Sequence, residues 1–277
     1  MTMWSFFHGL KAVARFHDYG PQPVTFSGTI RWIKQFQKQD RKVAGHLLDQ
    51  VIYLSEKDTR KILLHQNKVL MEDLAKAGLP PKKLVYLQTD EAGSSSPVML
   101  SMIRNEAGLQ QRGCKLLDSR DALGINKITN KLEEGALVYI DDFVGSGDQF
   151  CTAREAVQKS VVGTFSEFLL VPSICEEGYH RLIDLGIAVY AGHIHSRAER
   201  PLHGNSHLLQ AADRIRLVEM CKQIRPKASL GFNDLATMVV LYRNAPNSIP
   251  AVLRGSDKQT PFYGIFPRYK DLPINRG

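Results

Sequence analysis

Several motifs that identify common protein classes are missing from this sequence of 277 residues. No G-x-x-x-x-G-K-S/T occurs, which excludes a P-loop nucleotide site. The G-x-G-x-x-G dinucleotide fingerprint also fails, because Phe150 stands where its third glycine would be. The four cysteines lie far apart without a C-x-x-C pair, so neither a zinc knuckle nor a disulfide scaffold is predicted.

Long hydrophobic runs are also missing. No stretch approaches the roughly 20 apolar residues that a membrane span needs. The first ten residues lack the basic and apolar regions of a signal peptide. We therefore expect reduced thiols, no membrane segment and a cytoplasmic location.

Positive charge is in excess, with 36 Lys and Arg against 28 Asp and Glu and a net charge of +8. Such an excess indicates an anionic ligand or partner, such as a nucleotide, a phosphate or a nucleic acid, without distinguishing among them. No motif supports nucleic acid, and the basic residues between Arg214 and Lys227 are typical of a solvated helix face.

The most informative stretch runs from Ala136 to Phe150. An apolar run rich in β-formers leads into Asp141 and Asp142, then into a turn of Gly145, Ser146 and Gly147, and then into a helical pattern. Glycine amides and a helix N-terminus suit a phosphate, and two carboxylates can accept hydrogen bonds from sugar hydroxyls or hold a divalent ion. The stretch therefore predicts a ribose 5-phosphate site, although acidic residues and glycines also end strands simply as good turns.

A second polar loop follows the expected strand Leu84–Leu87. Ser94, Ser95 and Ser96 come after Gly93 and precede an apolar helical pattern, with Arg104 about two turns on. Amides, hydroxyls and a guanidinium can bind an anion there, while a polar linker with capping serines is the alternative. The glycine-rich and charged segment Asn105–Glu134 is a candidate for a mobile flap.

Short apolar runs alternate with helical patterns along the rest of the chain, as in a parallel sheet covered on both faces. We predict an α/β fold with a mainly parallel sheet of about five strands, helices on both faces and an N-terminal helical layer. In domain terms, residues 1–80 form the helical layer packed on a core of residues 81–277. The expected strands are Leu84–Leu87, Ala136–Ile140, Phe168–Val171, Ile187–Tyr190 and Met238–Leu241, and the expected N-terminal helices are Phe26–Asp40, Val43–Leu54 and Ser55–Leu74.

Two further stretches carry candidate chemistry. Four histidines follow the fourth expected strand, but no cysteine or well-spaced carboxylate completes a ligand set, so we predict a surface loop and no metal at His193, His195, His203 and His207. After the last strand, a rigid loop built from Asn244, Pro246 and Asn247 is in a position to set a binding residue.

The central stretch resembles the phosphoribosyl-diphosphate (PRPP) binding motif of type I phosphoribosyltransferases. Asp141 and Asp142 match the acidic pair, and the turn from Gly145 to Gly147 matches the phosphate loop, whereas Asp148 and Gln149 depart from it. The C-terminal loop resembles the Pro-Asn signature of phosphoribosyltransferase-like domains in bacterial conflict and defence operons, beside ATPases or the reverse transcriptases of retrons.

This resemblance implies roles for the candidate residues. Asp141 and Asp142 would be catalytic and hold the ribose hydroxyls, while Gly145, Ser146, Gly147, Asp148 and Gln149 would bind the 5-phosphate. Ser94, Ser95, Ser96 and Arg104, with Mg²⁺ carried by the substrate, would bind the pyrophosphate. Asn244, Pro246 and Asn247 would form the acceptor loop.

The functions implied are pentosyl transfer from PRPP, or binding of another ribose 5-phosphate ligand, in a bacterial defence system. An ATPase or reverse transcriptase is the implied partner protein. The alternative is a catalytically inactive subunit that senses a nucleotide or docks on such a partner, which the residues at 148 and 149 favour.

Overall fold

The structure is a computed structural model, and it describes residues 3–89, 95–256 and 262–272. The chain forms two compact units. One unit is continuous, residues 57–194, and the other combines residues 1–56 with residues 195–277. This division differs from the predicted boundary at residue 80.

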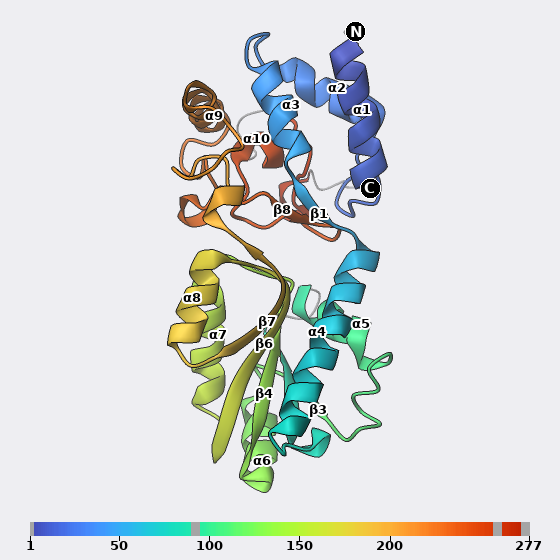
Figure 1. Cartoon of the computed structure of the whole chain (residues 1–277), viewed down its shortest axis with the longest axis vertical. Helices are drawn as coiled ribbons and strands as arrows, with labels where there is room; N and C mark the ends of the chain where they lie inside the picture. The colour runs from blue at the N-terminus through green and yellow to red at the C-terminus, as the bar shows by residue number, and fades with distance from the viewer. Residues whose placement is uncertain (1–2, 90–94, 257–261, 273–277) are drawn as a thin grey trace. The chain divides into compact units, whose positions relative to one another are not determined.

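The continuous unit alternates strands with helices (Figure 1). Its strands are β2 (Leu84–Gln88), β3 (Lys115–Asp118), β4 (Glu134–Ile140), β5 (Phe143–Val144), β6 (Thr164–Cys175) and β7 (Ala188–His195). Its helices are α4 (Glu56–Lys76), the 3-10 turn η1 (Pro81–Lys83), α5 (Ser95–Arg104), α6 (Ala122–Leu132), α7 (Asp148–Gln158) and α8 (Glu176–Asp184).

The strands of this unit form one six-stranded sheet in the order β3-β2-β4-β6-β5, with β7 paired to β6. The pairs β2–β3, β2–β4, β4–β6 and β5–β6 are all parallel. All but the first residue of β4 are buried, as expected of a central parallel strand covered on both faces. The predicted α/β class with a mainly parallel sheet is therefore confirmed.

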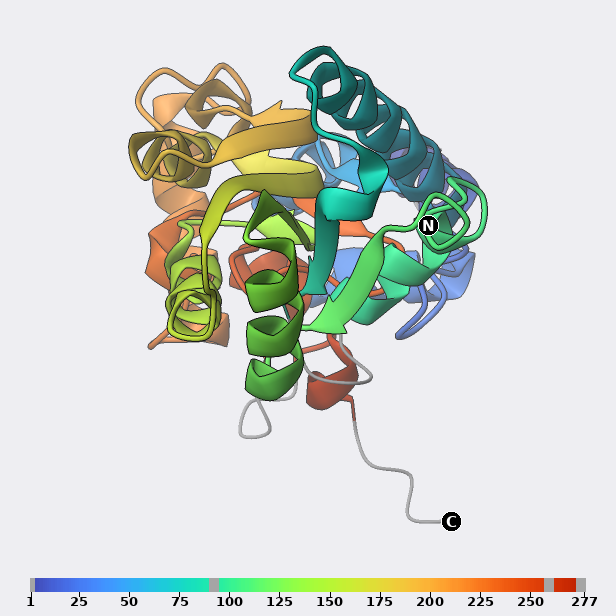
Figure 2. The ribbon, with the colours of Figure 1, turned by 90° about the horizontal axis from the view of Figure 1, so that it is seen from below.

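Helices cover both faces of the sheet (Figures 1 and 2). On one face, Ile125 of α6, Phe150 of α7 and Leu182 of α8 join the apolar core of the strands. On the other face, the Tyr86 hydroxyl donates a 2.7 Å hydrogen bond to Asn67 of α4. Successive strand residues point to opposite faces, so a continuous apolar strand needs both helical layers.

The segment predicted as a mobile flap contains regular structure. Strand β3 and helix α6 occupy much of residues 105–134. The Asp121 carboxylate accepts a 2.9 Å hydrogen bond from the Gly124 amide, which caps α6, and Ile125 is fully buried. β3 is a short edge strand with a charged residue at each end, so the local sequence pattern does not predict its pairing with β2.

The second unit is mainly helical. It contains α1 (Met3–Phe16), α2 (Phe26–Gln35), α3 (Arg41–Asp49), β1 (Ile52–Leu54), η2 (Arg197–Glu199), α9 (Ala211–Ile224), η3 (Phe232–Asp234), β8 (Val239–Leu241), α10 (Ala251–Arg254) and η4 (Tyr269–Asp271). Its core is rich in aromatic rings, and two of the buried rings donate hydrogen bonds from their polar atoms. Trp32 donates to the Val252 carbonyl at 2.8 Å, and Tyr19 donates to the Pro267 carbonyl at 2.7 Å.

Two sequence predictions for this unit are wrong. A helix was predicted over Val43–Leu54, but the observed helix α3 ends at Asp49 and Ile52–Leu54 is a strand. The segment Met238–Leu241 forms β8 over its last three residues, but it pairs with β1 in a separate two-stranded sheet instead of closing the main one. The amide of Ile52 donates to the Met238 carbonyl at 2.8 Å, a non-local contact that overrides local helix preference.

The four cysteines are buried and none is in a disulfide. Among the described helices, none combines the length and the hydropathy that crossing a bilayer would require.

Candidate functional site

The acidic pair lies at an interruption between β4 and β5. The pairing of β4 with β6 joins Ile140 to Leu170, and the pairing of β5 joins Phe143 to Ser173, so the register offset is the same before and after the interruption. Only Asp141 and Asp142 leave the ladder, and both are half-buried. Their carboxylates are therefore held at the carboxyl end of a central strand, where open α/β sheets bind ligands.

Local hydrogen bonds fix the backbone of this pair. The Asp141 amide still reaches the Leu170 carbonyl at 3.3 Å, and the Asp142 amide donates to Asp141 Oδ1 at 2.8 Å. A carboxylate has about four lone-pair sites, so it can accept more than one hydrogen bond. The geometry suits hydrogen bonding to a diol.

The turn after β5 leads directly into helix α7. Gly147 is the N-cap residue with φ 85° and ψ −5°, a left-handed conformation that glycine adopts without cost. Its carbonyl accepts the first helical bond, from Cys151 at 2.9 Å. The first amides of a helix have no acceptor within the helix, so the amides after Gly147 converge on the turn with the positive end of the helix dipole.

Helix α7 is held against the sheet by a polar contact. Glu167 of β6 accepts hydrogen bonds of 3.0 and 2.9 Å from Arg154 Nε and one of 2.9 Å from the Tyr139 hydroxyl. Because Tyr139 lies on β4, this carboxylate joins the strand that carries the acidic pair to the helix that follows the predicted phosphate loop.

Asp148, in the first turn of α7, is paired inside the turn. Its Oδ2 accepts a 2.7 Å hydrogen bond from the Ser146 hydroxyl, and its Oδ1 pairs with Arg181 of α8. The same guanidinium nitrogen lies 3.4 Å from the Ser146 carbonyl oxygen. The predicted phosphate loop thus contains a carboxylate, as expected from the sequence, and also a cation that the sequence analysis did not find.

Helix α8 packs directly on the loop. A side-chain Cβ built at Gly178 would lie 2.4 Å from the Gly145 carbonyl oxygen, which is closer than any real contact. A glycine at this position is therefore needed for the close approach that brings Arg181 to the turn. A glycine in the first turn of a helix was the one signal in the sequence that could have suggested this contact.

The second predicted anion loop is only partly described. Ser94 and the side chain of Ser95 lie outside the described residues. Ser96 is fully buried, and its hydroxyl donates to the Ile140 carbonyl at 2.5 Å and accepts from the Thr89 amide at 2.8 Å. It joins the carboxyl ends of β2 and β4 to the start of α5.

Arg104 lies at the opposite end of α5 from Ser96. Arg104 is the last residue of α5, and a rise of 1.5 Å per residue places it roughly 13 Å along the axis from Ser95. Its Nε donates to the neighbouring Asn105 at 3.2 Å. The geometry of α5 therefore does not support a pyrophosphate contact shared by Arg104 and Ser96.

The missed strand β3 adds an ion pair to the same edge of the sheet. Asp118 pairs in register with Gln88, and Gln88 pairs with Ile140. Asp118 therefore lies two strands across the sheet from the acidic pair, and two strand spacings are about 10 Å. Arg120 Nε and Nη2 donate to its carboxylate at 3.0 and 2.8 Å, and these side-chain bonds are the largest cause of a pKa lowered to about 2. This carboxylate is ionised at neutral pH.

The predicted acceptor loop belongs to the other unit. Asn244, Pro246 and Asn247 follow β8, and Pro246 is buried whereas Asn247 is exposed. The Asn247 carbonyl accepts from the Phe232 amide at 3.1 Å, and the Ala245 amide donates to the Tyr19 hydroxyl at 3.0 Å. These bonds anchor the loop within its own unit.

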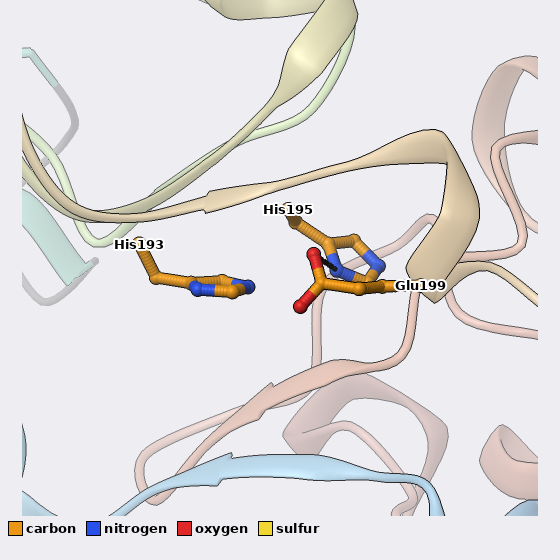
Figure 3. Close-up of side chains that lie close together, drawn as sticks. All are labelled: His193, His195 and Glu199. Carbon is orange, nitrogen blue, oxygen red and sulfur yellow. Dashed lines mark ion pairs between the residues drawn. The ribbon is translucent and has the colours of Figure 1, made fainter.

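Two of the histidines lie on β7 and not on the predicted surface loop. His193 and His195 are among the last three residues of the strand, and Glu199 of η2 follows closely (Figure 3). One potential ligand atom from each of the three lies within 4.8 Å of the others. A carboxylate therefore does accompany the histidines, contrary to the sequence analysis.

Hydrogen bonding nevertheless argues against cation binding at His195. Its Nε2 accepts a 3.1 Å hydrogen bond from the Met238 amide, so in the neutral ring the proton is on Nδ1. That nitrogen lies 3.5 Å from Glu199, whose carboxylate also accepts from the Ser196 amide at 2.7 Å. Neither ring nitrogen then has a lone pair for a metal, and the arrangement stabilises the turn after β7.

Comparison with known proteins gives distant structural matches. One is an orotate phosphoribosyltransferase from Aeropyrum pernix, with 15% identity and a TM-score of 0.32 over 49% of this chain and 68% of that chain. Another is an HGPRT-ase from Leishmania tarentolae in complex with GMP, with 9% identity and a TM-score of 0.33 over 45% of this chain and 70% of that chain. No curated protein matches.

A family model gives a far more extensive match. The model of the PRTase-CE family matches residues 29–268. This range contains the acidic pair, the glycine turn, the serine stretch 94–96 and the C-terminal Pro-Asn loop. The chain therefore belongs to the PRTase-CE family.

Proposed function

We propose that this protein binds a ribose 5-phosphate ligand, PRPP or a nucleotide, together with Mg²⁺, and that it transfers the pentosyl group. The observation that carries the proposal is the placement of Asp141 and Asp142 at the interruption between β4 and β5, three residues before a glycine turn that caps α7. Carboxylates for a diol and amides for a phosphate lie at one edge of one sheet.

Each part of the site has a physical task in such a reaction. The carboxylates of Asp141 and Asp142 hold the ribose hydroxyls, and the amides after Gly147 hold the 5-phosphate. Ribosyl transfer has an oxocarbenium-like transition state, so positioning and ionic stabilisation of the leaving pyrophosphate supply most of the catalysis without a covalent nucleophile.

Mg²⁺ fits the donors at this edge. It prefers oxygen ligands and binds through one or two carboxylates with substrate phosphates, and the half-buried pair at the strand end offers such oxygens. Bound with the substrate, the ion would neutralise charge on the pyrophosphate. Asp141 and Asp142 are the residues that would approach it.

A second candidate function is a ligand-binding subunit without transferase activity. The Asp148 carboxylate within the phosphate loop favours it, because an anion there opposes a phosphate. In either case we propose a role in a bacterial defence system beside an ATPase or reverse transcriptase, which the gene neighbourhood tests directly.

Soaking crystals with PRPP and Mg²⁺ tests the proposal. We expect the 5-phosphate on the amides between Gly145 and Gln149 and the ribose hydroxyls on Asp141 and Asp142. A loop whose amides are all bonded internally, with no ligand at this edge, would contradict it. Release of pyrophosphate in solution then separates the transferase from the binding subunit.

A further inference from the structure

The side chain of Arg181 enters the phosphate loop from a helix that follows it by about thirty residues. Its Nη1 pairs with Asp148 Oδ1 and lies 3.4 Å from the Ser146 carbonyl oxygen. About 44% of the Arg181 side chain and 43% of the Asp148 side chain are exposed, so solvent and solutes reach the pair.

We propose that Arg181 binds the 5-phosphate of the ligand, exchanging its partner Asp148 for the phosphate. The inference rests on the proposed function, because it assigns a further residue to the same site. It also defines the ligand class, since a guanidinium at this point selects a ribose whose 5-carbon carries a phosphate over an unphosphorylated ribose.

The charge balance of the loop supports the exchange. The first turn of α7 favours an anion, and without ligand the Asp148 carboxylate occupies that position. A phosphate arriving beside Asp148 would meet a like charge, which the helix dipole alone offsets only weakly. Arg181 is a cation already in contact with this turn. A guanidinium pairs with phosphate through two parallel hydrogen bonds.

The packing of α8 supports a fixed position for the guanidinium. Gly178 allows the helix backbone to contact the Gly145 carbonyl, and Leu182 and the Arg181 side-chain stem lie against Gly147. The donor therefore needs little ordering when the ligand arrives, which is the condition for a preorganised contact.

Calorimetric titration of the full chain with PRPP and Mg²⁺ tests the role of Arg181. We expect Arg181→Gln to weaken binding at least tenfold, as for loss of a charge-assisted contact, and Arg181→Lys to restore part of it. Lys159→Gln is the matched control, because it removes the same charge at the other end of α7 and should change the affinity less than twofold. Asp148→Asn should strengthen binding at least twofold, because it removes the competing anion.

The outcomes separate this inference from the function on which it rests. If wild-type protein does not bind PRPP, the proposed function and this inference both fail. If wild type binds and both Arg181→Gln and Asp148→Asn bind as wild type does, only the role of Arg181 is wrong. Titration with ribose in place of PRPP should show no difference between wild type and Arg181→Gln.

Discussion

At the residue scale, glycines decide where the proposed phosphate loop can lie. Gly147 has a left-handed backbone with φ 85°, and a Cβ built on it would lie 3.2 Å from Leu182 Cδ1. A larger residue would therefore strain the backbone and also press on α8. Glycine here serves both the turn and the close packing of the helix behind it.

Replacing Gly147 by Val should lower stability and ligand affinity together. A β-branched residue in the left-handed region costs about 1–3 kcal/mol, and the displaced turn would no longer present its amides. Thermal unfolding and titration with PRPP measure the two effects.

Gly186→Val provides the control for this substitution. Gly186 is also left-handed, with φ 77°, but a Cβ there would meet nothing within 4 Å. It should lose comparable stability and keep its affinity for PRPP. Equal loss of affinity in both variants would mean that strain alone, and not the position of the loop, explains the effect.

Residues near one another in sequence could be predicted, and those that meet only in the fold could not. The acidic pair and the turn from Gly145 to Gly147 lie in one continuous pattern, and the structure places them as a strand end, a turn and a helix start. Arg181 reaches the same turn from α8 through a tertiary contact, and the glycine at 178 is the one local signal in the sequence for it.

At the element scale, an ion cluster anchors the segment that contains η4. Asp271 pairs with Arg254 of α10 at 2.7 Å and with Arg225, after α9, at 3.3 Å, and all three side chains are at most 12% exposed. Burial raises the pKa of Asp271, but the hydrogen bond and charge of Arg254, followed by those of Arg225, more than offset this and lower the pKa overall.

Asp271→Asn should destabilise the protein by about 3 kcal/mol at neutral pH, because two buried guanidiniums would lose their counter-charge. A carboxyl pKa lowered by folding contributes stability above its unfolded value of about 4, and this stability is lost as pH falls through the folded value. Urea unfolding should therefore show a difference between wild type and variant that shrinks below about pH 4.

The exposed Asp184 provides a control for the ion cluster. Asp184→Asn, at the end of α8, should change the unfolding free energy by less than about 0.5 kcal/mol, both at neutral pH and below about pH 4. A difference between wild type and Asp271→Asn that stays constant from pH 7 to pH 3 would contradict the assigned role of the Asp271 charge.

Elements with strong local patterns could be predicted, and those defined by pairing could not. β2 and β4 are continuous apolar runs, and Gly78, with φ 78°, ends α4 near the predicted stop. The partners of β3 and β8 are set by contacts distant in sequence, so one strand was missed and the other was assigned to the wrong sheet.

At the scale of the whole molecule, the positive charge is not where the candidate site lies. Residues 57–194 carry 16 Lys and Arg against 18 Asp and Glu, whereas the other unit carries 20 against 10. The net charge of the chain therefore gives no support for an anionic ligand at the acidic pair. In our proposal, local amides and Arg181 supply the attraction instead.

A fragment of residues 55–194 should fold by itself. It contains the complete six-stranded sheet except for the last residue of β7, and a buried apolar core drawn from the strands and α6 to α8. We expect a cooperative thermal transition by circular dichroism and PRPP affinity within about tenfold of the full chain, because the proposed ligand contacts belong to this unit. An unfolded fragment would contradict the independence of the unit.

The central claim is that Asp141 and Asp142 bind a ribose 5-phosphate ligand, and a double substitution by Asn tests it most directly. Adjacent carboxylates repel each other, so without ligand the variant should be as stable as wild type or more stable. Calorimetry with PRPP and Mg²⁺ should show a large loss of affinity, because two charge-assisted hydrogen bonds of about 1.5–3 kcal/mol each are weakened. Equal binding by wild type and variant, or no binding of any ribose phosphate by either, would contradict the claim.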